Sequence, residues 1–166
     1  MVMPRPPWWP APLASPWAHD KDYNAADPVN LVFLGVRLSD VTAHLTSKGW
    51  GPPTILWFYV ADDQWLHYEN QMNPQKKQLA KNYYRPPTGF RVHVRFWEFD
   101  TIVVGSAHWE RLVAKHTPLS FERAEKIVAR EFVVSTWKVS YDAAILPWTF
   151  LHSPSSNGYA TLIQRV

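Results

Sequence analysis

The order of apolar and polar residues predicts a strand, a helix and a second strand in the first third of the chain. Residues Val29–Gly35 are a mostly apolar run of strand-forming residues, which predicts a strand. Within Arg37–Lys48 the apolar residues recur at spacings of three and four, so we expect a helix there, ended by Gly49. The apolar run Thr54–Val60 predicts the next strand.

Residues 62–88 lack a clear period. Pro74, Pro86 and Pro87 interrupt a polar stretch that holds several Lys and Tyr residues. Proline has no backbone N–H group and disfavours both helix interiors and central strands. We therefore expect a loop with one short helix across this segment.

The second half of the chain is predicted to hold a strand pair, a helix and further strands. Phe90–Phe99 and Ile102–Trp109 alternate well enough to predict paired strands. Ser120–Trp137 has an apolar side at helical spacing and begins with a serine suited to cap a helix. Ala143–Phe150 and Tyr159–Gln164 predict one or two more strands. Together these elements predict one α+β domain over residues 29–166, with a mostly antiparallel or mixed sheet and two main helices.

Residues 1–28 differ in composition from the rest and are predicted to form an extended arm. The chain has 15 prolines and 10 tryptophans, and a good share of them lies before residue 29. The prolines favour an extended, polyproline-like backbone. An aromatic side chain buries on the order of 150–250 Å² when it docks. We therefore expect Trp8, Trp9 and Trp17, together with Pro10, to dock either on the domain's own sheet or on another chain.

Charge and cysteine content exclude several classes of function. The net charge of +3 is mild and the Lys and Arg residues are dispersed, so charge alone does not indicate a nucleic-acid-binding protein. The absence of cysteine excludes disulfides, thiolate metal sites and cysteine nucleophiles. There is no run of about 18 apolar residues to span a membrane, no export signal, and no glycine-rich phosphate loop. We expect a cytoplasmic protein without a cofactor.

The candidate chemistry lies on one face of the strand predicted over Phe90–Phe99. The period of two places four apolar residues on one face and puts Arg91, His93, Arg95 and Trp97 on the other. Two guanidinium groups, an imidazole and an indole are an unusual set for one strand face. This face is therefore the first candidate for a site.

A two-residue turn at Asp100-Thr101 would bring polar groups of the next strand onto the same face. The turn lacks the glycine that such loops prefer, so a longer loop is the alternative. With the short turn, the predicted cross-strand pairs are Arg95 with Ser106, His93 with His108, and Arg91 with Glu110.

Several interpretations of this face stay open. It could bind an anion through the arginine forks, catalyse proton transfer with its histidines, or be structural, with an exposed Arg91–Glu110 ion pair and half-buried histidines. A metal would need His116 or a carboxylate as a third ligand, and we assign none. The anion-binding set is Arg91, His93, Arg95 and His108. We assign no catalytic residue; if the protein is an enzyme, the catalytic set is His93, His108 and Glu110.

Several blocks of the sequence resemble the LssY C-terminal domain family. In order, they are Asp27–Gly35 (DPVNLVFLG), a helix ending at Gly49-Trp50, His93–Trp97 (HVRFW), Val104–Ala107, and the string from His116 to Glu122-Arg123. The likeness runs from about residue 27 to residue 135. The chain departs from the family at Thr117-Pro118-Leu119, where acidic residues are expected after His116.

The resemblance implies an association rather than an activity. Members of that family are often fused to, or associated with, membrane proteins of the type-2 phosphatidic acid phosphatase sort, and the family has no established activity. A membrane-side accessory role is therefore implied. This chain itself has no predicted membrane segment.

We predict a non-catalytic accessory subunit that docks through its N-terminal arm onto other protein subunits of a larger assembly. The assembly would lie at the cytoplasmic face of a membrane, where the chain would contact a membrane protein or lipid head groups. The His/Arg face would bind an anionic group. One alternative is a small phosphoesterase-like hydrolase that uses His93 and His108 with Arg91 and Arg95. A further alternative is nucleic-acid binding through Lys76–Arg85.

Overall fold

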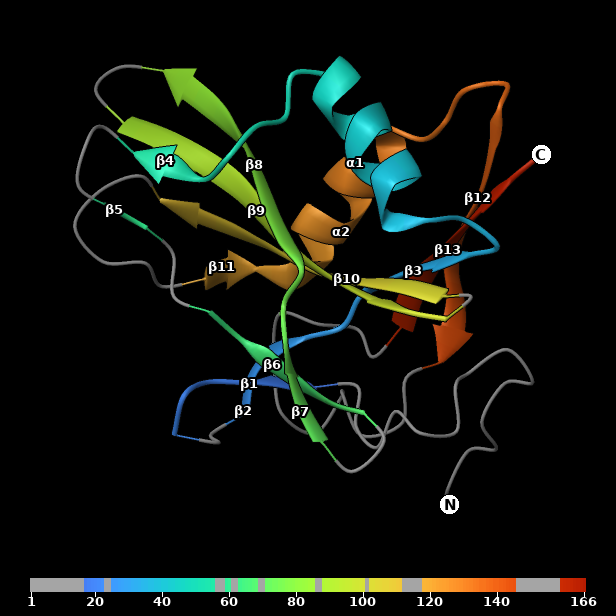
Figure 1. The fold of residues 1–166 in the computed structure, drawn as a ribbon. Helices are drawn as coiled ribbons and strands as arrows, with labels where there is room; N and C mark the ends of the chain where they lie inside the picture. The colour runs from blue at the N-terminus through green and yellow to red at the C-terminus, as the bar shows by residue number, and fades with distance from the viewer. Residues whose placement is uncertain are drawn as a thin grey trace.

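A seven-stranded sheet forms the middle layer of the molecule (Figure 1). The computed structural model describes residues 17–22, 25–55, 59–60, 63–68, 71–85, 88–100, 102–111, 118–145 and 159–166. The strand order is β12-β13-β3-β10-β9-β8, with β11 paired to β10. The strands are β3 (Leu31–Leu34), β8 (Lys77–Arg85), β9 (Thr88–Phe99), β10 (Ile102–Arg111), β11 (Pro118–Ser120), β12 (Trp137–Ile145) and β13 (Tyr159–Arg165).

Two helices and a smaller sheet cover this middle layer. The helices are α1 (Leu38–Ser47) and α2 (Phe121–Arg130), and they lie together on one side of the large sheet (Figure 1). The small sheet has the order β2-β1-β6-β7 and contains β1 (Trp17–His19), β2 (Ala25–Pro28), β6 (Trp65–Tyr68) and β7 (Gln71–Pro74). A two-stranded piece pairs β4 (Thr54–Ile55) with β5 (Tyr59–Val60).

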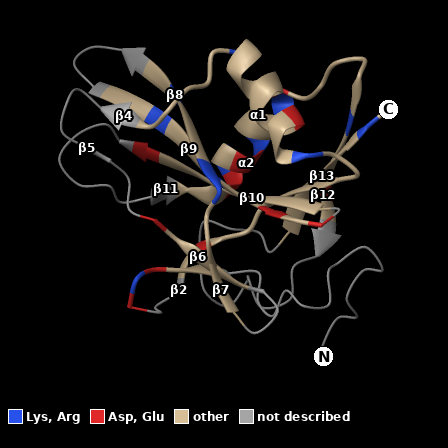
Figure 2. Cartoon of the chain, in the orientation of Figure 1, with Lys and Arg blue, Asp and Glu red and all other residues tan. Residues whose placement is uncertain are grey.

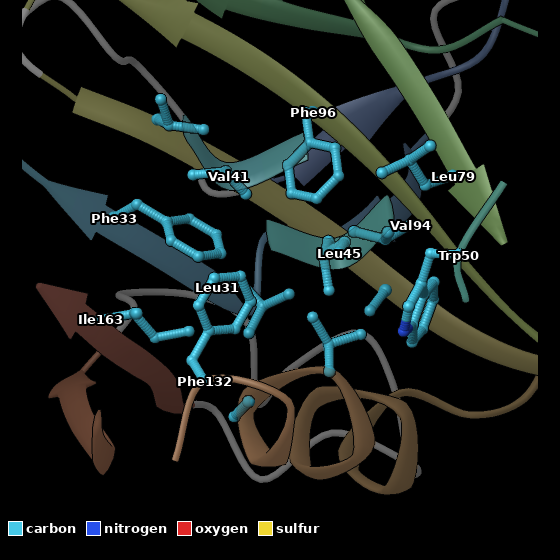
Figure 3. Packing of buried hydrophobic residues seen from close by; sticks show 14 of the residues in the cluster. Leu31, Phe33, Val41, Leu45, Trp50, Leu79, Val94, Phe96, Phe132 and Ile163 are labelled. Atoms are coloured by element: carbon cyan, nitrogen blue, oxygen red, sulfur yellow. The ribbon is translucent and has the colours of Figure 1, made fainter. Parts of the chain in front are cut away.

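Each face of the large sheet has its own apolar core. On the helix side, Leu31 and Phe33 of β3 pack with Val94 and Phe96 of β9 and with Phe132, which follows α2 (Figure 3). On the opposite side, the alternate residues of the same strands pack against the small sheet. That second cluster contains Ala18, Val32, Leu66, Trp97 and Val104. A sheet with both faces buried explains why β3 and the first three residues of β10, Ile102–Val104, are continuously apolar.

The α+β prediction with a mostly antiparallel sheet and two helices is confirmed. Within the described residues the pair β13–β3 is parallel and every other strand pair is antiparallel. The first predicted helix is α1, and Gly49 follows it with φ +93°, a conformation that glycine adopts at no steric cost. Among the residues that the structure describes, no helix is long and apolar enough to cross a membrane.

The short turn between β9 and β10 is confirmed. Phe99 pairs with Ile102, and the pairing continues without a shift to Phe90 opposite Arg111. Asp100 takes φ +39°, in the left-handed region that aspartate tolerates better than most residues. The turn therefore forms without the glycine that its type prefers.

The prediction of a loop with a short helix over residues 62–88 is wrong where the structure describes that segment. It holds β6, β7 and the nine-residue edge strand β8. In β8, Leu79 pairs with Val94 and Tyr83 with Phe90, so one face rests on the core. Lys77, Lys81 and Asn82, which alternate with or flank these apolar residues, concealed the pattern, because an edge strand carries polar residues toward water.

Three boundaries also differ from the prediction. The single strand expected over Thr54–Val60 is instead the two short strands β4 and β5, which pair with each other. The second helix ends at Arg130 rather than near Trp137, because Phe132 turns into the core and the β-branched residues that follow disfavour a helix. Strand β12 accordingly begins at Trp137, earlier than Ala143.

Candidate functional site

The charged face of β9 and β10 is turned toward the small sheet and is buried. Its residues are 0% exposed for Arg91, 1% for His93, 5% for Arg95, 4% for His108 and 2% for Glu110. Strand β2 contributes a carboxylate, Asp27, which is 5% exposed. We call these six residues the ionic cluster: Asp27, Arg91, His93, Arg95, His108 and Glu110.

His108 lies at the centre of the ionic cluster, with a carboxylate on each side of its ring. Its Nδ1 lies 2.7 Å from Asp27 Oδ2, and its Nε2 lies 2.9 Å from Glu110 Oε2. An ionised carboxylate only accepts hydrogen bonds, and the pKa values of Asp27 and Glu110 are both lowered, so His108 donates at both ring nitrogens. The ring is therefore held in its doubly protonated, cationic form.

An arginine pairs with each of these two carboxylates. Arg95 Nη1 donates to Asp27 Oδ2 over 3.1 Å, and Arg91 Nε donates to Glu110 Oε1 over 2.5 Å, with Arg91 Nη2 contacting the same oxygen. Positive and negative groups thus alternate along a row that runs from Arg95 to Arg91 through His108. The two arginines and the histidine neutralise both buried carboxylates at short range.

The electrostatics of the row set its protonation. Burial alone would lower the pKa of His108, but the charges and hydrogen bonds of Asp27 and Glu110 outweigh burial and raise the pKa to about 9. Burial alone would raise the pKa of each carboxyl. His108 and Arg95 hold the pKa of Asp27 below its usual range, and His108 and Arg91 do the same for Glu110. At neutral pH His108 is therefore protonated, and Asp27 and Glu110 are ionised.

His93 contacts His108 through its ring rather than through a hydrogen bond. The two ring centroids lie 5.0 Å apart, with the rings nearly perpendicular. His93 Nε2 donates to the side-chain oxygen of Gln78 in β8 over 2.5 Å. The predicted pair therefore meets, and the two rings are held by different partners.

Side-chain hydrogen bonds to the backbone hold the segment that carries Asp27 against β10. Ser106 Oγ donates to the carbonyl oxygen of Pro28 over 2.7 Å. The Asn30 side chain donates to the carbonyl of Ala107 and accepts from its N–H group, each over 2.9 Å. These bonds join residues that are more than 70 positions apart in sequence, and they bring the Asp27 carboxylate to His108.

The cross-strand pairs predicted from the register are confirmed, but one interpretation of them is wrong. Arg91 pairs with Glu110 as expected. That ion pair is buried rather than exposed, and the histidines are buried rather than half-buried, because β2 and the small sheet cover the face. The assignment of this face to anion binding stays a prediction.

The donor atoms of His93, His108 and Glu110 all lie within 4.8 Å of one another, which is close enough for one metal ion. Glu110 thus stands where a carboxylate third ligand was expected, while His116 lies outside the described residues. A metal ligand histidine must offer a lone pair, whereas the raised pKa of His108, about 9, favours a ring that is protonated at both nitrogens and faces a carboxylate on each side. The donor set in its present protonation does not fit a metal.

A second acidic group, Glu122, Glu125 and Asp142, surrounds a lysine. Lys126 Nζ lies 2.7 Å from Asp142, 3.4 Å from Glu122 and 3.6 Å from Glu125. The ammonium group occupies the position that a cation would take. Lys126 therefore cancels part of the negative charge of this group.

The residues expected to dock the arm are placed only in part. Trp8, Trp9 and Pro10 lie outside the described residues. Trp17 belongs to the backbone of β1, and residues 25–28 of the predicted arm form β2. Residues 17–19 and 25–28 of the arm segment are therefore strands of the small sheet that covers the ionic cluster.

Asp27 and Gln78 are the partners that sequence reasoning missed. Asp27 lies 81 positions from His108, and Gln78 lies 15 positions from His93 on a strand that was not predicted. A buried histidine and arginine side by side call for a carboxylate, which was the available signal. That signal indicates a partner without saying which of the 14 acidic residues it is.

Comparison of the chain with protein-family models, with curated protein sequences and with solved structures finds no match. The resemblance to the LssY C-terminal domain family therefore stays a prediction. The arguments about function rest on the geometry of the chain itself.

Proposed function

We propose that this chain is a non-catalytic binding module whose ionic cluster is a structural joint between its two sheets. The observation that carries this is the position of His108, which donates to a carboxylate at each ring nitrogen. A general base must offer a lone pair, and an imidazolium ion has none to offer. His108 therefore serves as a cation that cancels Asp27 and Glu110.

The joint connects elements that the chain order leaves far apart. Asp27 belongs to the small sheet, whereas His108 and Glu110 belong to β10 of the large sheet. A buried charge is costly unless it is paired, so removing either end exposes the other to an apolar surrounding. Such a cluster favours one relative placement of the large and small sheets over other placements.

The accessory role predicted from the sequence is kept as part of this proposal. The arm would bind a subunit of a larger assembly through Trp8, Trp9 and Trp17, and the family resemblance supports a membrane-side location. The test compares the full chain with a chain that begins at residue 17, each purified at native level and examined by mass spectrometry of the co-purifying proteins. The role is supported if the shortened chain loses a stoichiometric partner while its stability in urea stays the same as that of the full chain. An unchanged set of partners contradicts it.

One observation favours the hydrolase alternative, namely the closeness of the donor atoms of His93, His108 and Glu110. With a divalent metal in place of the His108 protons, this trio could activate water against a phosphoester. The assay is hydrolysis of p-nitrophenyl phosphate with and without added zinc or manganese. Metal-dependent turnover that His93→Gln abolishes, while His67→Gln leaves it intact, would replace the non-catalytic proposal.

A further inference from the structure

A groove of about 520 Å³ lies between α2 and the strands β8 and β10, on the helix side of the large sheet. Four cationic side chains line it against one acidic side chain, Glu131. Figure 2 shows Lys and Arg positions in blue on α2 and on strands beside it. The cations are Lys81 of β8 and Arg123, Lys126 and Arg130 of α2.

The helix spacing places three of these cations on one face. Residues separated by three and by seven positions lie on the same side of a helix, which is the relation of Arg123 to Lys126 and to Arg130. Seven residues of helix span about 10 Å. Arg123 and Arg130 therefore stand near the two ends of the groove.

Only part of this positive charge is cancelled within the molecule. Lys126 is paired with Asp142 and Glu122, and Lys81 lies 3.8 Å from Glu131. In the described part of the chain, neither Arg123 nor Arg130 has a carboxylate within ion-pair distance. Both arginines are exposed, so their guanidinium groups can take up a ligand without breaking an internal bond.

Aromatic rings line the sheet side of the groove and contact one of its cations. The guanidinium carbon of Arg123 lies 4.6 Å from the centre of the Trp109 ring, and Tyr83 contacts the same ring at 5.7 Å. Trp109 is also stacked on Phe90, which fixes its position. An arginine held over an aromatic ring keeps its planar donor groups directed outward, in a geometry suited to phosphate oxygens.

We propose that this groove, which we call the basic groove, binds a ligand carrying two or more phosphate groups. Two arginine positions about 10 Å apart along the helix axis, with Lys126 between them, match a chain of phosphates better than a single carboxylate. The groove is separate from the ionic cluster, whose arginines are already bonded to Asp27 and Glu110. This inference deepens the proposed function, since it gives the binding module a class of ligand.

The test uses the full chain, inorganic tripolyphosphate as a free probe, and two vesicle preparations. One preparation is phosphatidylcholine alone, and the other also contains phosphatidylinositol bisphosphate. Titration calorimetry and vesicle sedimentation at low salt measure the affinities. The variant R123Q/R130Q is expected to weaken binding at least tenfold, and R130Q alone about threefold, because each lost guanidinium removes a charge-assisted contact.

A matched control separates the groove from general charge. K21Q/K138Q removes the same net charge at two exposed lysines that do not line the groove, and it should leave the affinity within about twofold. Binding of tripolyphosphate assigns a free phosphate ligand, and binding of the phosphoinositide vesicles alone assigns a lipid head group. Both outcomes support the proposal if R123Q/R130Q weakens the binding at least tenfold.

Two results overturn it: no binding of either probe by the unaltered chain, or equal weakening of the affinity by R123Q/R130Q and by K21Q/K138Q. Neither of these results depends on His108 or its carboxylates. Failure of the phosphate-binding proposal would therefore leave the proposed structural role of the ionic cluster unaffected.

Discussion

Replacing His108 by glutamine should change how the stability of this protein depends on pH. The pKa of His108 is raised in the folded state from an ordinary 6.5 to about 9 by Asp27 and Glu110, against the effect of burial. The folded protein therefore holds one more proton than the unfolded chain between these values. The stabilisation is fully present below the unfolded pKa and is lost as the pH rises through the folded pKa.

The size of the effect follows from that difference in pKa. One extra bound proton makes the free energy of unfolding fall by about 1.4 kcal/mol per pH unit, and the whole interval corresponds to roughly 3 kcal/mol. Glutamine has one amide donor end and one acceptor end, so it cannot donate to both carboxylates or titrate. His108→Gln should be less stable than the unaltered chain at about pH 6, with a difference that shrinks steadily toward about pH 9.

The assay is urea unfolding, followed by tryptophan fluorescence, at a series of pH values for both chains. The difference between the two stability curves isolates His108 from other titrating groups. Asp27→Asn is a second variant, because removing that carboxylate should move the alkaline loss toward the ordinary histidine pKa. Parallel stability curves for the unaltered chain and His108→Gln would refute the reasoning, since His108 would then not change its proton content on folding.

Three further substitutions test other parts of the structure by the same urea assay. Burial, with the charges of neighbouring carboxylates, raises the pKa of Glu125 to about 9, so its stabilising contribution is lost as the pH rises from 4.5 through 9. Glu125→Gln should therefore become progressively more stable than the unaltered chain, by about 1.4 kcal/mol per pH unit, and a constant difference would contradict this. Gly105→Ala should cost roughly 1–3 kcal/mol, because its added Cβ would lie 3.3 Å from both Leu31 and Phe96, and an unchanged stability would show that these neighbours yield freely. Ser120→Ala should cost about 1 kcal/mol by removing the cap that accepts from the first turn of α2, and Ser120→Asn should restore most of it.

The strand pair β9–β10 could be predicted from sequence because its information is local. Alternation sorts the side chains of Phe90–Phe99, and a two-residue turn fixes the register for all ten pairs. The same local logic located α1, the start of α2 at Ser120, and β13. It also brought His93 to His108 and Arg91 to Glu110.

What could not be predicted depends on contacts between distant segments. The burial of the charged face comes from β2 and the small sheet, and nothing near Arg91 or His93 in the sequence announces that cover. The pairing of Asp27 with His108 could not be predicted either, because the two residues lie in different sheets. The basic groove combines α2 with β8, a strand whose exposed lysines made it resemble a loop.

The protonation state of His108 at neutral pH tests the central claim most directly. Nitrogen NMR of side-chain-labelled protein at about pH 7 reports whether each ring nitrogen carries a proton. We expect both Nδ1 and Nε2 to be protonated, with ring protons that exchange slowly because each is bonded to a buried carboxylate. A spectrum in which one ring nitrogen of His108 lacks a proton would contradict the structural role and return this histidine to the list of catalytic bases.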